Sequence, residues 1–431
     1  MVPHLLPALM GPVSELEQRF LDSMPAIERW FRLEWMEHTP LVYSSVTLRN
    51  SGFKLAPVST NLYPSEWSQL APEMSPLAVQ AAMTAIQKIC PEAKNLLIIV
   101  ANKIADSNYL DSLSQLQQLF QRAGLHVRIG SIDGQLKEKN NLTVSSGESL
   151  LIEPVIREKG RIGLKDFDPC TILLNNNLIA GIPGILEDLH QQYLLPPLHG
   201  ASNFRRKSNY SNCYEMVTKR MGKVLAVDPW LFTPMHETCG KLFMQEPNDM
   251  LYLKEKVNAL LAKIKRKYKE YGIKEKPFVV VKADNSSACS SMAIVRDAND
   301  LQKFYFGFKE AELSGADIHP AVEILVQEGI LTKEQISDSV AEPVVYMMDR
   351  YVVGGFYRIH PSMGIDDDLK APGSSYIPIS SEKESEMAQK EVEFGARRPN
   401  RFYMYGVVAR LAMLASSYEL EATDPDAEEY Y

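Results

Sequence analysis

The sequence predicts an α/β protein with a parallel α/β layer near the N-terminus and a strand-rich C-terminal half. The first observation is the wholly apolar run Leu96–Val100, which is typical of a strand buried on both faces of a parallel sheet. The second is the helical segment after it, which ends before another apolar run at Leu125–Ile129. Strand, helix and strand in this order form a βαβ unit. The third is a series of short strand-like runs after residue 277.

Helical segments surround the first strands. Apolar residues at helical spacing predict an amphipathic helix over Ser14–Glu37 and further helices over Leu77–Cys90 and Leu110–Arg122. Gly124 follows the third of these and is typical of a residue that ends a helix. The polar residues 134–147 predict a surface loop.

The remaining elements follow in chain order. We expect a short strand at Thr171–Leu174 that leads into three asparagines, then a helix at Ile185–Tyr193 and a basic amphipathic helix at Lys254–Tyr271. After a strand that begins at Phe278, we expect strands at Val344–Met347, Tyr351–Val353 and Gly355–Ile359, a loop over Pro361–Pro378, a polar excursion over Ser380–Pro399 and a long apolar helix over Phe402–Glu421.

Composition narrows the class of protein. The chain has 431 residues, 23% of them charged, and a net charge of −8, so it has no basic excess with which to neutralise nucleic-acid phosphates. The five cysteines are scattered without a CxxC pair, which argues against a disulfide framework or a zinc site. Residues 1–12 lack the basic start of a signal peptide, and no apolar run is long enough to span a membrane. We therefore expect a cytoplasmic protein that binds neither membrane nor nucleic acid.

The most informative segment is Phe278–Val295. It reads as an apolar strand ending in Lys282, a loop of small residues, and a second apolar strand. A lysine fixed beside such a flap can hold the phosphates of a nucleotide, because backbone N–H groups can approach where few side chains stand in the way. With an extended segment, Ala341–Tyr346, some sixty residues later as an adenine hinge, the pattern describes an ATP-grasp cleft. A plain hairpin with a solvated turn is the alternative.

Two groups of cations could bind an anionic ligand. Arg205, Arg206 and Lys207 are adjacent in an otherwise acidic protein, and arginine binds carboxylate or phosphate in bidentate fashion. Arg358 and His360 alternate along a predicted strand and therefore point to one face of it. The alternatives are a solvated basic turn for the first group and an exposed edge strand for the second.

Carboxylates for a magnesium ion are available but are not arranged in a recognisable motif. Mg²⁺ takes one or two carboxylates together with phosphate oxygens. We select Asp349, Glu419 and Glu421 as candidate ligands, with the run Asp366–Asp368 as an alternative source.

Long stretches of the chain resemble the proteobacterial glutamate–cysteine ligases of the ATP-grasp type. The resemblance runs in the same order through nearly the whole sequence, in segments that include LRNSGFKLAPVSTNLYP at Leu48–Pro64, LPPLHGASNFRRKSNY at Leu195–Tyr210, ALLAKIKRKYKEYGIKEKPFVVVKAD at Ala259–Asp284, AEPVVYMMDRYVVGGFYRIH at Ala341–His360 and FYMYGVVARLAMLASSYELE at Phe402–Glu421.

The resemblance implies an ATP-dependent ligation of glutamate to cysteine. ATP would phosphorylate the γ-carboxylate of glutamate, and the amine of cysteine would displace phosphate to give γ-glutamylcysteine. The reaction needs a phosphate clamp, Mg²⁺ and cations that stabilise the acyl phosphate and the oxyanion. A protein of the same family without turnover, binding nucleotide or an amino acid in a regulatory role, and a ligase with an altered substrate are the alternatives.

This resemblance assigns roles to particular residues. The anion-binding catalytic residues are Arg205, Arg206, Lys207 and Arg358. The ATP-binding residues are Lys282, Asp284, Ser286, Ser287, Cys289, Ser291, Glu342, Val344 and Val345. The residues expected to bind the amino-acid substrate are Asn61, Asn176, Ser208 and His360.

The sequence departs from the family pattern at a few positions. Three flap glycines of the family are Ser286, Cys289 and Ser291 here, and Lys370 stands where the family has asparagine. Ser59 replaces an expected aspartate. Wherever the flap backbone requires a positive φ, a residue other than glycine costs about 1 kcal/mol or more.

The chain order suggests three regions. We expect an N-terminal α/β domain over residues 1–170, a middle substrate-binding region over 171–275 and an ATP-grasp nucleotide-binding region over 276–431. The number of subunits is left open.

Overall fold

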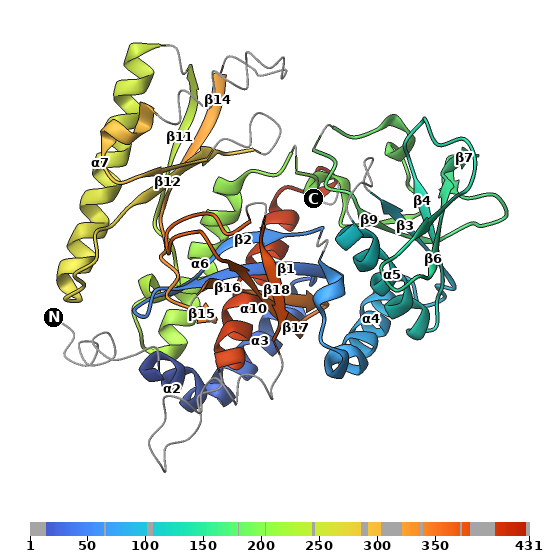
Figure 1. The fold of residues 1–431 in the computed structure, drawn as a ribbon, viewed down its shortest axis with the longest axis horizontal. Coiled ribbons are helices and arrows are strands. Elements are labelled where there is room, and N and C mark those ends of the chain that lie inside the picture. The colour runs from blue at the N-terminus through green and yellow to red at the C-terminus, as the bar shows by residue number, and fades with distance from the viewer. Residues whose placement is uncertain are drawn as a thin grey trace.

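Three large β-sheets, a two-stranded sheet and the helices that cover them make up the described structure, and the predicted mixed α/β class is confirmed (Figure 1). The computed structural model describes residues 14–63, 66–100, 107–179, 181–202, 204–243, 246–285, 292–302, 321–336, 339–370, 373–379 and 401–427. None of the described helices is long and apolar enough to cross a membrane.

The central sheet is antiparallel and joins the two ends of the chain. Its strand order is β18-β17-β16-β1-β2, and β15 pairs with the first residues of β16. The strands are β1 (Tyr43–Asn50), β2 (Leu55–Asn61), β15 (Gln335–Ile336), β16 (Ser339–Met348), β17 (Tyr351–His360) and β18 (Ser375–Pro378). Helix α10 (Arg401–Ala422) contacts β1, β2, β16 and β17, and its apolar residues are buried. A helix that is apolar all round is stable only in such a buried position.

The parallel sheet lies beside the central one, on the right of Figure 1. Its order is β10-β9-β3-β4-β6-β5, with only β5 antiparallel among the described strands. The strands are β3 (Asn95–Val100), β4 (His126–Ser131), β5 (Asn140–Thr143), β6 (Ser149–Pro154), β9 (Thr171–Asn175) and β10 (Tyr193–Leu195). Leu96–Val100 are fully buried, as an apolar strand in a parallel sheet requires. Helices α4 (Ser75–Ile89) and α5 (Ser107–Arg122) pack on one face.

The four-stranded sheet forms a separate lobe at the upper left of Figure 1. Its order is β11-β14-β12-β13, all antiparallel. The strands are β11 (His236–Phe243), β12 (Val279–Ala283), β13 (Met292–Val295) and β14 (Ala321–Glu328). Helix α7 (Pro247–Glu270) covers one face with buried residues at helical spacing, among them Leu253, Val257 and Ile264.

The remaining elements complete the chain. The other helices are α2 (Ser14–Asp22), α3 (Met24–Glu37) and α6 (Lys207–Leu225), and β7 (Ile156–Glu158) pairs with β8 (Arg161–Gly163). Short 3₁₀ turns lie at Trp67–Gln69 (η1), Pro72–Met74 (η2), Gly184–Leu186 (η3), Leu198–Gly200 (η4), Pro229–Leu231 (η5) and Ala298–Asp300 (η6).

Most predicted elements are present, with five differences. The first predicted helix is divided at Ser23, where Pro25 begins the next helix. The helix predicted at Ile185–Tyr193 is wrong: only η3 is helical, and Tyr193 begins strand β10. Asp188 in this stretch has φ +53°, which a right-handed helix cannot contain. The predicted loop over residues 134–147 contains β5, and the loop predicted over Pro361–Pro378 ends in β18. The two strands predicted at Tyr351–Val353 and Gly355–Ile359 form one strand, β17.

Strand pairing crosses the boundaries that chain order suggested after residues 170 and 275. Strands β9 and β10, after the first boundary, belong to the parallel sheet, and β11, before the second, belongs to the four-stranded sheet. Strand β1 pairs with the C-terminal strand β16, and β2 follows β1 at the edge of the same sheet. The cause is long-range pairing, which local patterns do not encode. The predicted excursion at Ser380–Pro399 lies outside the described residues.

Candidate active site

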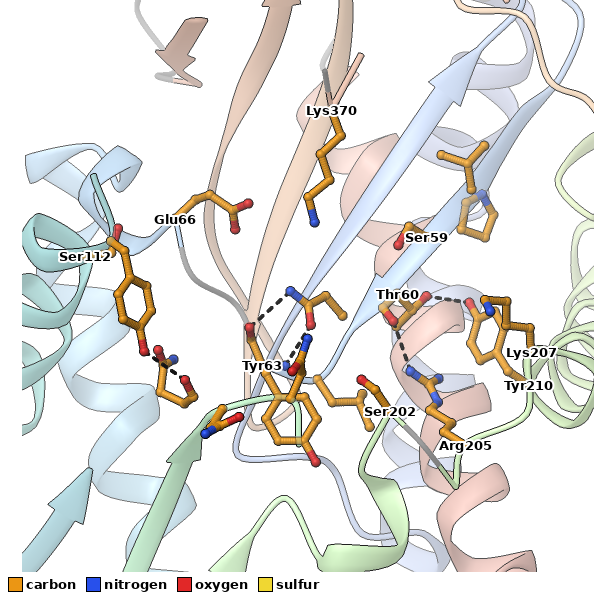
Figure 2. A pocket seen from close by; sticks show the side chains of 18 of the residues that line it. Ser59, Thr60, Tyr63, Glu66, Ser112, Ser202, Arg205, Lys207, Tyr210 and Lys370 are labelled. Carbon is orange, nitrogen blue, oxygen red and sulfur yellow. Dashed lines mark hydrogen bonds between the residues drawn. The ribbon is translucent and has the colours of Figure 1, made fainter. Parts of the chain in front are cut away.

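A cavity of about 890 Å³ opens where the three sheets meet (Figure 2). Its lining comes from strand β2, the turn before η1, the start of α5, the end of β9, the start of α6 and strands β12 and β14. Lys370, Gly373, Ser374 and Tyr376 complete it. Its size is in the range that holds small-molecule substrates. One end is cationic and the opposite wall consists mainly of amides and hydroxyls.

Lys282 and Lys207 form the cationic end. Lys282 lies on β12, where Val279 and Val281 face the α7 side, so the alternation of the strand directs Lys282 to the opposite face. Its Nζ donates to Gln327 Oε1 at 2.7 Å. Lys207 Nζ donates to the backbone oxygens of Ala283 at 2.6 Å and Asn285 at 3.1 Å. In the described structure, neither ammonium forms an ion pair.

Burial makes both of these ammonium groups acidic. It lowers the pKa of Lys282 to about 8, with further lowering by the charge of Lys207 and partial compensation by Asp284. Burial likewise lowers the pKa of Lys207 to about 8, against the opposing effect of Asp284. Two adjacent lysines whose charges are costly in the empty protein are suited to a polyphosphate, whose negative charge would compensate both.

Asp284 organises this end without lining the cavity. It is 3% exposed and accepts hydrogen bonds from Ser208 N at 2.7 Å and Ser208 Oγ at 2.6 Å. Ser208 is in the first turn of α6, where a carboxylate is stabilised by the helix N-terminus. Asp284 and Ser208 therefore join the start of α6 to the end of β12 and hold Lys207 beside Lys282.

Arg205 and Arg206 do not share the situation of Lys207. Arg205 Nε lies 2.8 Å from Glu419 Oε2, Nη1 donates to Thr60 O at 3.0 Å, and Nη2 donates to Ser416 Oγ at 3.2 Å. Arg206 is about half exposed and pairs with Glu323. Arg205 lines the cavity, and its charge is compensated by a carboxylate that is 2% exposed.

The amide wall lies at the carboxyl ends of β3 and β9. Val100 at the end of β3 pairs with Asn175 at the end of β9. From β3 the chain continues to β4, which lies on the side of β3 opposite to β9. Ligands of open α/β sheets bind at such a switch point. Asn176 Nδ2 donates to Val100 O at 3.2 Å, and Tyr109 Oη donates to Asn175 O at 2.9 Å.

Asn61, which was predicted to bind substrate, also lines the cavity, with Asn176. Asn61 Nδ2 donates to Tyr63 O at 3.1 Å, and its Oδ1 accepts from Tyr63 N at 2.9 Å, so the side chain fixes the turn after β2 (Figure 2). Ser208 and His360 are buried, and neither lines the cavity.

The predicted adenine hinge is wrong. Val344 pairs with Phe356 and Thr47, and Val345 with Gly355 and Val46, so both neighbouring strands occupy the backbone groups that adenine would need. Glu342 is 2% exposed and accepts from Arg358 Nη1 at 2.7 Å and Arg49 Nε at 3.1 Å. Glu342 and Arg358 therefore form a buried ion pair in the central sheet, and neither lines the cavity.

The carboxylates selected as candidate magnesium ligands lie apart, each beside a cation of its own. Asp349 accepts from Lys88 Nζ at 2.7 and 2.8 Å, Glu419 binds Arg205, and Glu421 lies 2.7 Å from His38 Nδ1. Nowhere in the described part of the chain do three or more His, Cys, Asp or Glu side chains gather as a metal site. The flap residues Ser286, Ser287, Cys289 and Ser291 lie outside the described residues.

Several lining residues escaped the sequence analysis. Gln327 reaches the cavity from β14, the strand after which the chain passes to the central sheet. Tyr210 Oη accepts from Thr60 Oγ1 at 2.7 Å, and Glu66 precedes η1. No motif surrounds Glu66 or Gln327 in the sequence. Tyr210 lies one helical turn after Arg206, and this spacing is the signal that could have identified it.

Comparisons with known proteins identify the family of this chain. A family model described as glutamate-cysteine ligase matches residues 17–420. The solved structure of a candidate gamma-glutamylcysteine synthetase from Methylobacillus flagellatus KT is 45% identical with a TM-score of 0.86, and the match covers 98% of this chain and 100% of that one. D-alanyl-alanine synthetase A from Vibrio cholerae O1 biovar eltor str. N16961 reaches a TM-score of 0.31 at 11% identity, over 74% of this chain and 81% of that one, too low to support an argument. No protein of curated function matches. The chain therefore belongs to the glutamate–cysteine ligase family.

Proposed function

We propose that the protein is an ATP-dependent glutamate–cysteine ligase of the ATP-grasp type that forms γ-glutamylcysteine through an acyl phosphate. The observation that carries the proposal is a pair of lysines, Lys207 and Lys282, at one end of a cavity whose other wall is amide-lined. Neither lysine forms an ion pair with a residue that the structure describes. This arrangement lies within a chain that matches the family from residue 17 to 420.

The two lysines are suited to hold the phosphates of ATP. Each ammonium already lies in a fixed position, because Gln327 orients Lys282 and two backbone oxygens orient Lys207. Pre-positioned charge of this kind stabilises the charge that develops during phosphoryl transfer. Mg²⁺ would be held mainly by phosphate oxygens and water, which agrees with a cavity that has few carboxylates.

The amide wall is suited to the amino-acid substrate. Asn61, Asn176 and their neighbours present both donors and acceptors, which can pair with the carboxylate and the ammonium of an α-amino acid. In this arrangement the γ-carboxylate of glutamate would extend toward the lysines. ATP and reduced cysteine are both available in the cytoplasm, where we expect the protein to act.

The test uses purified protein with Mg-ATP, L-glutamate and L-cysteine, and it measures released phosphate and γ-glutamylcysteine by mass spectrometry. We expect phosphate and dipeptide in equal amounts, with neither formed when glutamate is omitted. ATP at 100 times its Kd should also add about 2.7 kcal/mol to the free energy of unfolding. Stabilisation by ATP without phosphate release in the presence of both amino acids would contradict ligase activity.

A further inference from the structure

We propose that Glu66 and Lys370 together bind the head group of the amine substrate, and that Glu66 accepts the proton which that amine must lose before it attacks. This inference rests on the proposed function. Both side chains line the cavity and, in Figure 2, point toward the same part of it. A carboxylate and an ammonium that face one space match the opposite charges of an α-amino acid.

Glu66 has a distinct chemistry within the cavity. Among the described lining residues it is the one carboxylate, whereas Arg205, Lys207, Lys282 and Lys370 supply cations. Amides and hydroxyls of the remaining wall can accept a hydrogen bond from an ammonium group. They cannot take its proton at neutral pH, whereas a carboxylate can.

The position of Glu66 is fixed by buried neighbours. Trp67, the next residue, is 2% exposed and stacks on Tyr346 with ring centroids 4.7 Å apart. The hydroxyl of Tyr346 donates to the backbone oxygen of Glu66. Arg358 Nη2 lies 3.8 Å from Glu66 Oε1, and Arg358 is itself held by Glu342. The buried ion pair of the central sheet thus positions Glu66 from behind.

Lys370 reaches the cavity from the segment before β18, whereas Glu66 reaches it from the turn before η1. It lines the cavity with an exposed side chain and forms no ion pair with any residue that the structure describes. Its charge is therefore available for the α-carboxylate of an amino acid. A lysine here selects an amine that carries a carboxylate over one that lacks it.

The chemistry of the reaction determines which proton Glu66 would accept. The ammonium of cysteine must lose two protons to become an amide nitrogen. Glu66 takes the first and leaves a neutral amine, which attacks the γ-carbonyl carbon of γ-glutamyl phosphate. The C–N bond forms, the bond between this carbon and the phosphate oxygen breaks, and phosphate leaves with the electron pair. The second proton goes to phosphate, and Glu66 returns its proton to solvent. The ammonium of glutamate stays protonated and needs only acceptors.

The experiment separates the two halves of the reaction. Hydroxylamine is neutral at pH 7 and lacks a carboxylate, so it can trap the acyl phosphate as a hydroxamate without Glu66 or Lys370. We expect Glu66→Gln to lower dipeptide formation from cysteine by about 100-fold or more, whereas hydroxamate formation changes less than about threefold. Glu66→Asp, which keeps a carboxylate, should form more dipeptide than Glu66→Gln. Glu73→Gln, at an exposed position, serves as the matched control.

Lys370 is tested by substrate choice. The wild-type protein should prefer cysteine to cysteamine, which lacks the carboxylate, and Lys370→Met should reduce this preference by about tenfold or more. The exposed Lys276→Met is the control.

Three results would overturn the proposal. The first is an equal loss of hydroxamate and dipeptide formation in Glu66→Gln, and the second is unchanged dipeptide formation in that variant. The third is an unchanged preference for cysteine over cysteamine in Lys370→Met. If the wild-type protein forms neither product from glutamate and ATP, the ligase function itself fails, and this outcome is distinct from all three.

Discussion

Two pairs of cations around the cavity differ in what they contact. Arg205 and Arg206 each bind a carboxylate, Glu419 and Glu323. Lys207 and Lys282 are held by uncharged oxygens, those of Ala283, Asn285 and Gln327. The first pair forms direct ion pairs, whereas among the described residues the second pair is only partly compensated, by the charge of Asp284.

The difference separates structural charge from charge available to a ligand. Arg205, Arg206 and Lys207 are adjacent in the sequence, which predicts one anion-binding cluster. In the fold, Arg205 faces helix α10, Arg206 faces β14 and Lys207 faces the end of β12. A cation that already has a buried carboxylate gains less from a phosphate than a cation that lacks one. The predictions below test this distinction.

The largest expected effect is on stability. Glu419→Gln leaves the guanidinium of Arg205 buried without a charged partner, and breaking a buried pair in this way costs about 3–5 kcal/mol. The free energy of unfolding in urea measures the loss.

Glu421→Gln is the matched control on the same helix. Glu421 is 41% exposed, so the loss of its contact with His38 should cost less than about 1 kcal/mol. An equal cost for both variants would mean that burial does not distinguish these two carboxylates.

The next effect is on nucleotide affinity. Lys282→Met should weaken ATP binding by about 1.5–3 kcal/mol, or roughly 10- to 100-fold, because a charged hydrogen bond to phosphate is lost. The same variant without ATP should be at least as stable as the wild type, because a buried ammonium is removed. Isothermal titration calorimetry and urea unfolding provide the two values.

Lys276→Met is the matched control for this variant, since the residue is exposed and lies six positions earlier. Its ATP affinity should be that of the wild type. Loss of stability in Lys282→Met together with unchanged ATP affinity would show that Lys282 is structural and would remove the distinction drawn above.

The sequence predictions that agree with the structure are those that depended on a local pattern of residues. The wholly apolar Leu96–Val100 and the spacing in α7 identified their elements because burial on two faces or on one stripe leaves a local pattern. The role of Lys282 was assigned from its place at a strand end beside a loop of small residues, and its position in the cavity agrees with that assignment.

The predictions that failed depended on contacts between distant parts of the chain. Val344 and Val345 were selected as a hinge because the segment is extended, but β1, some 300 residues earlier in the chain, pairs with the strand and occupies its backbone. Glu419 was selected as a metal ligand because it is acidic, but Arg205 approaches it from the segment that precedes α6. Neither partner is visible in a local pattern.

The third effect is on pH dependence. The pKa of both Lys207 and Lys282 is lowered to about 8 in the ligand-free protein, mainly by burial. ATP affinity should therefore be full below pH 7 and should fall as pH rises through 8. For one lysine the fall is about tenfold between pH 7 and pH 9. Calorimetric titrations at a series of pH values measure it.

Stability without nucleotide should change in the opposite direction over the same interval. Above pH 8 the unfolded lysine keeps a proton that the folded lysine has lost, so the folding free energy becomes more favourable as pH rises. Comparison of wild type with Lys282→Met isolates this contribution. An affinity that stays constant up to pH 9.5 would mean that the two ammonium groups do not contact the nucleotide.

The smallest effect concerns Arg206. Its side chain is 47% exposed and its partner Glu323 is 16% exposed, so Arg206→Ala should change the free energy of unfolding by less than about 1 kcal/mol. ATP affinity should change less than about threefold, because the charge of Arg206 is already compensated and Arg206 does not line the cavity. Lys207→Ala, one residue later, should lose about tenfold or more in ATP affinity. Calorimetric titration of both variants compares two residues adjacent in the sequence, one paired with a carboxylate and the other held by backbone oxygens. Equal losses would mean that adjacency in the sequence, rather than the contact each side chain makes, decides which cations bind the nucleotide.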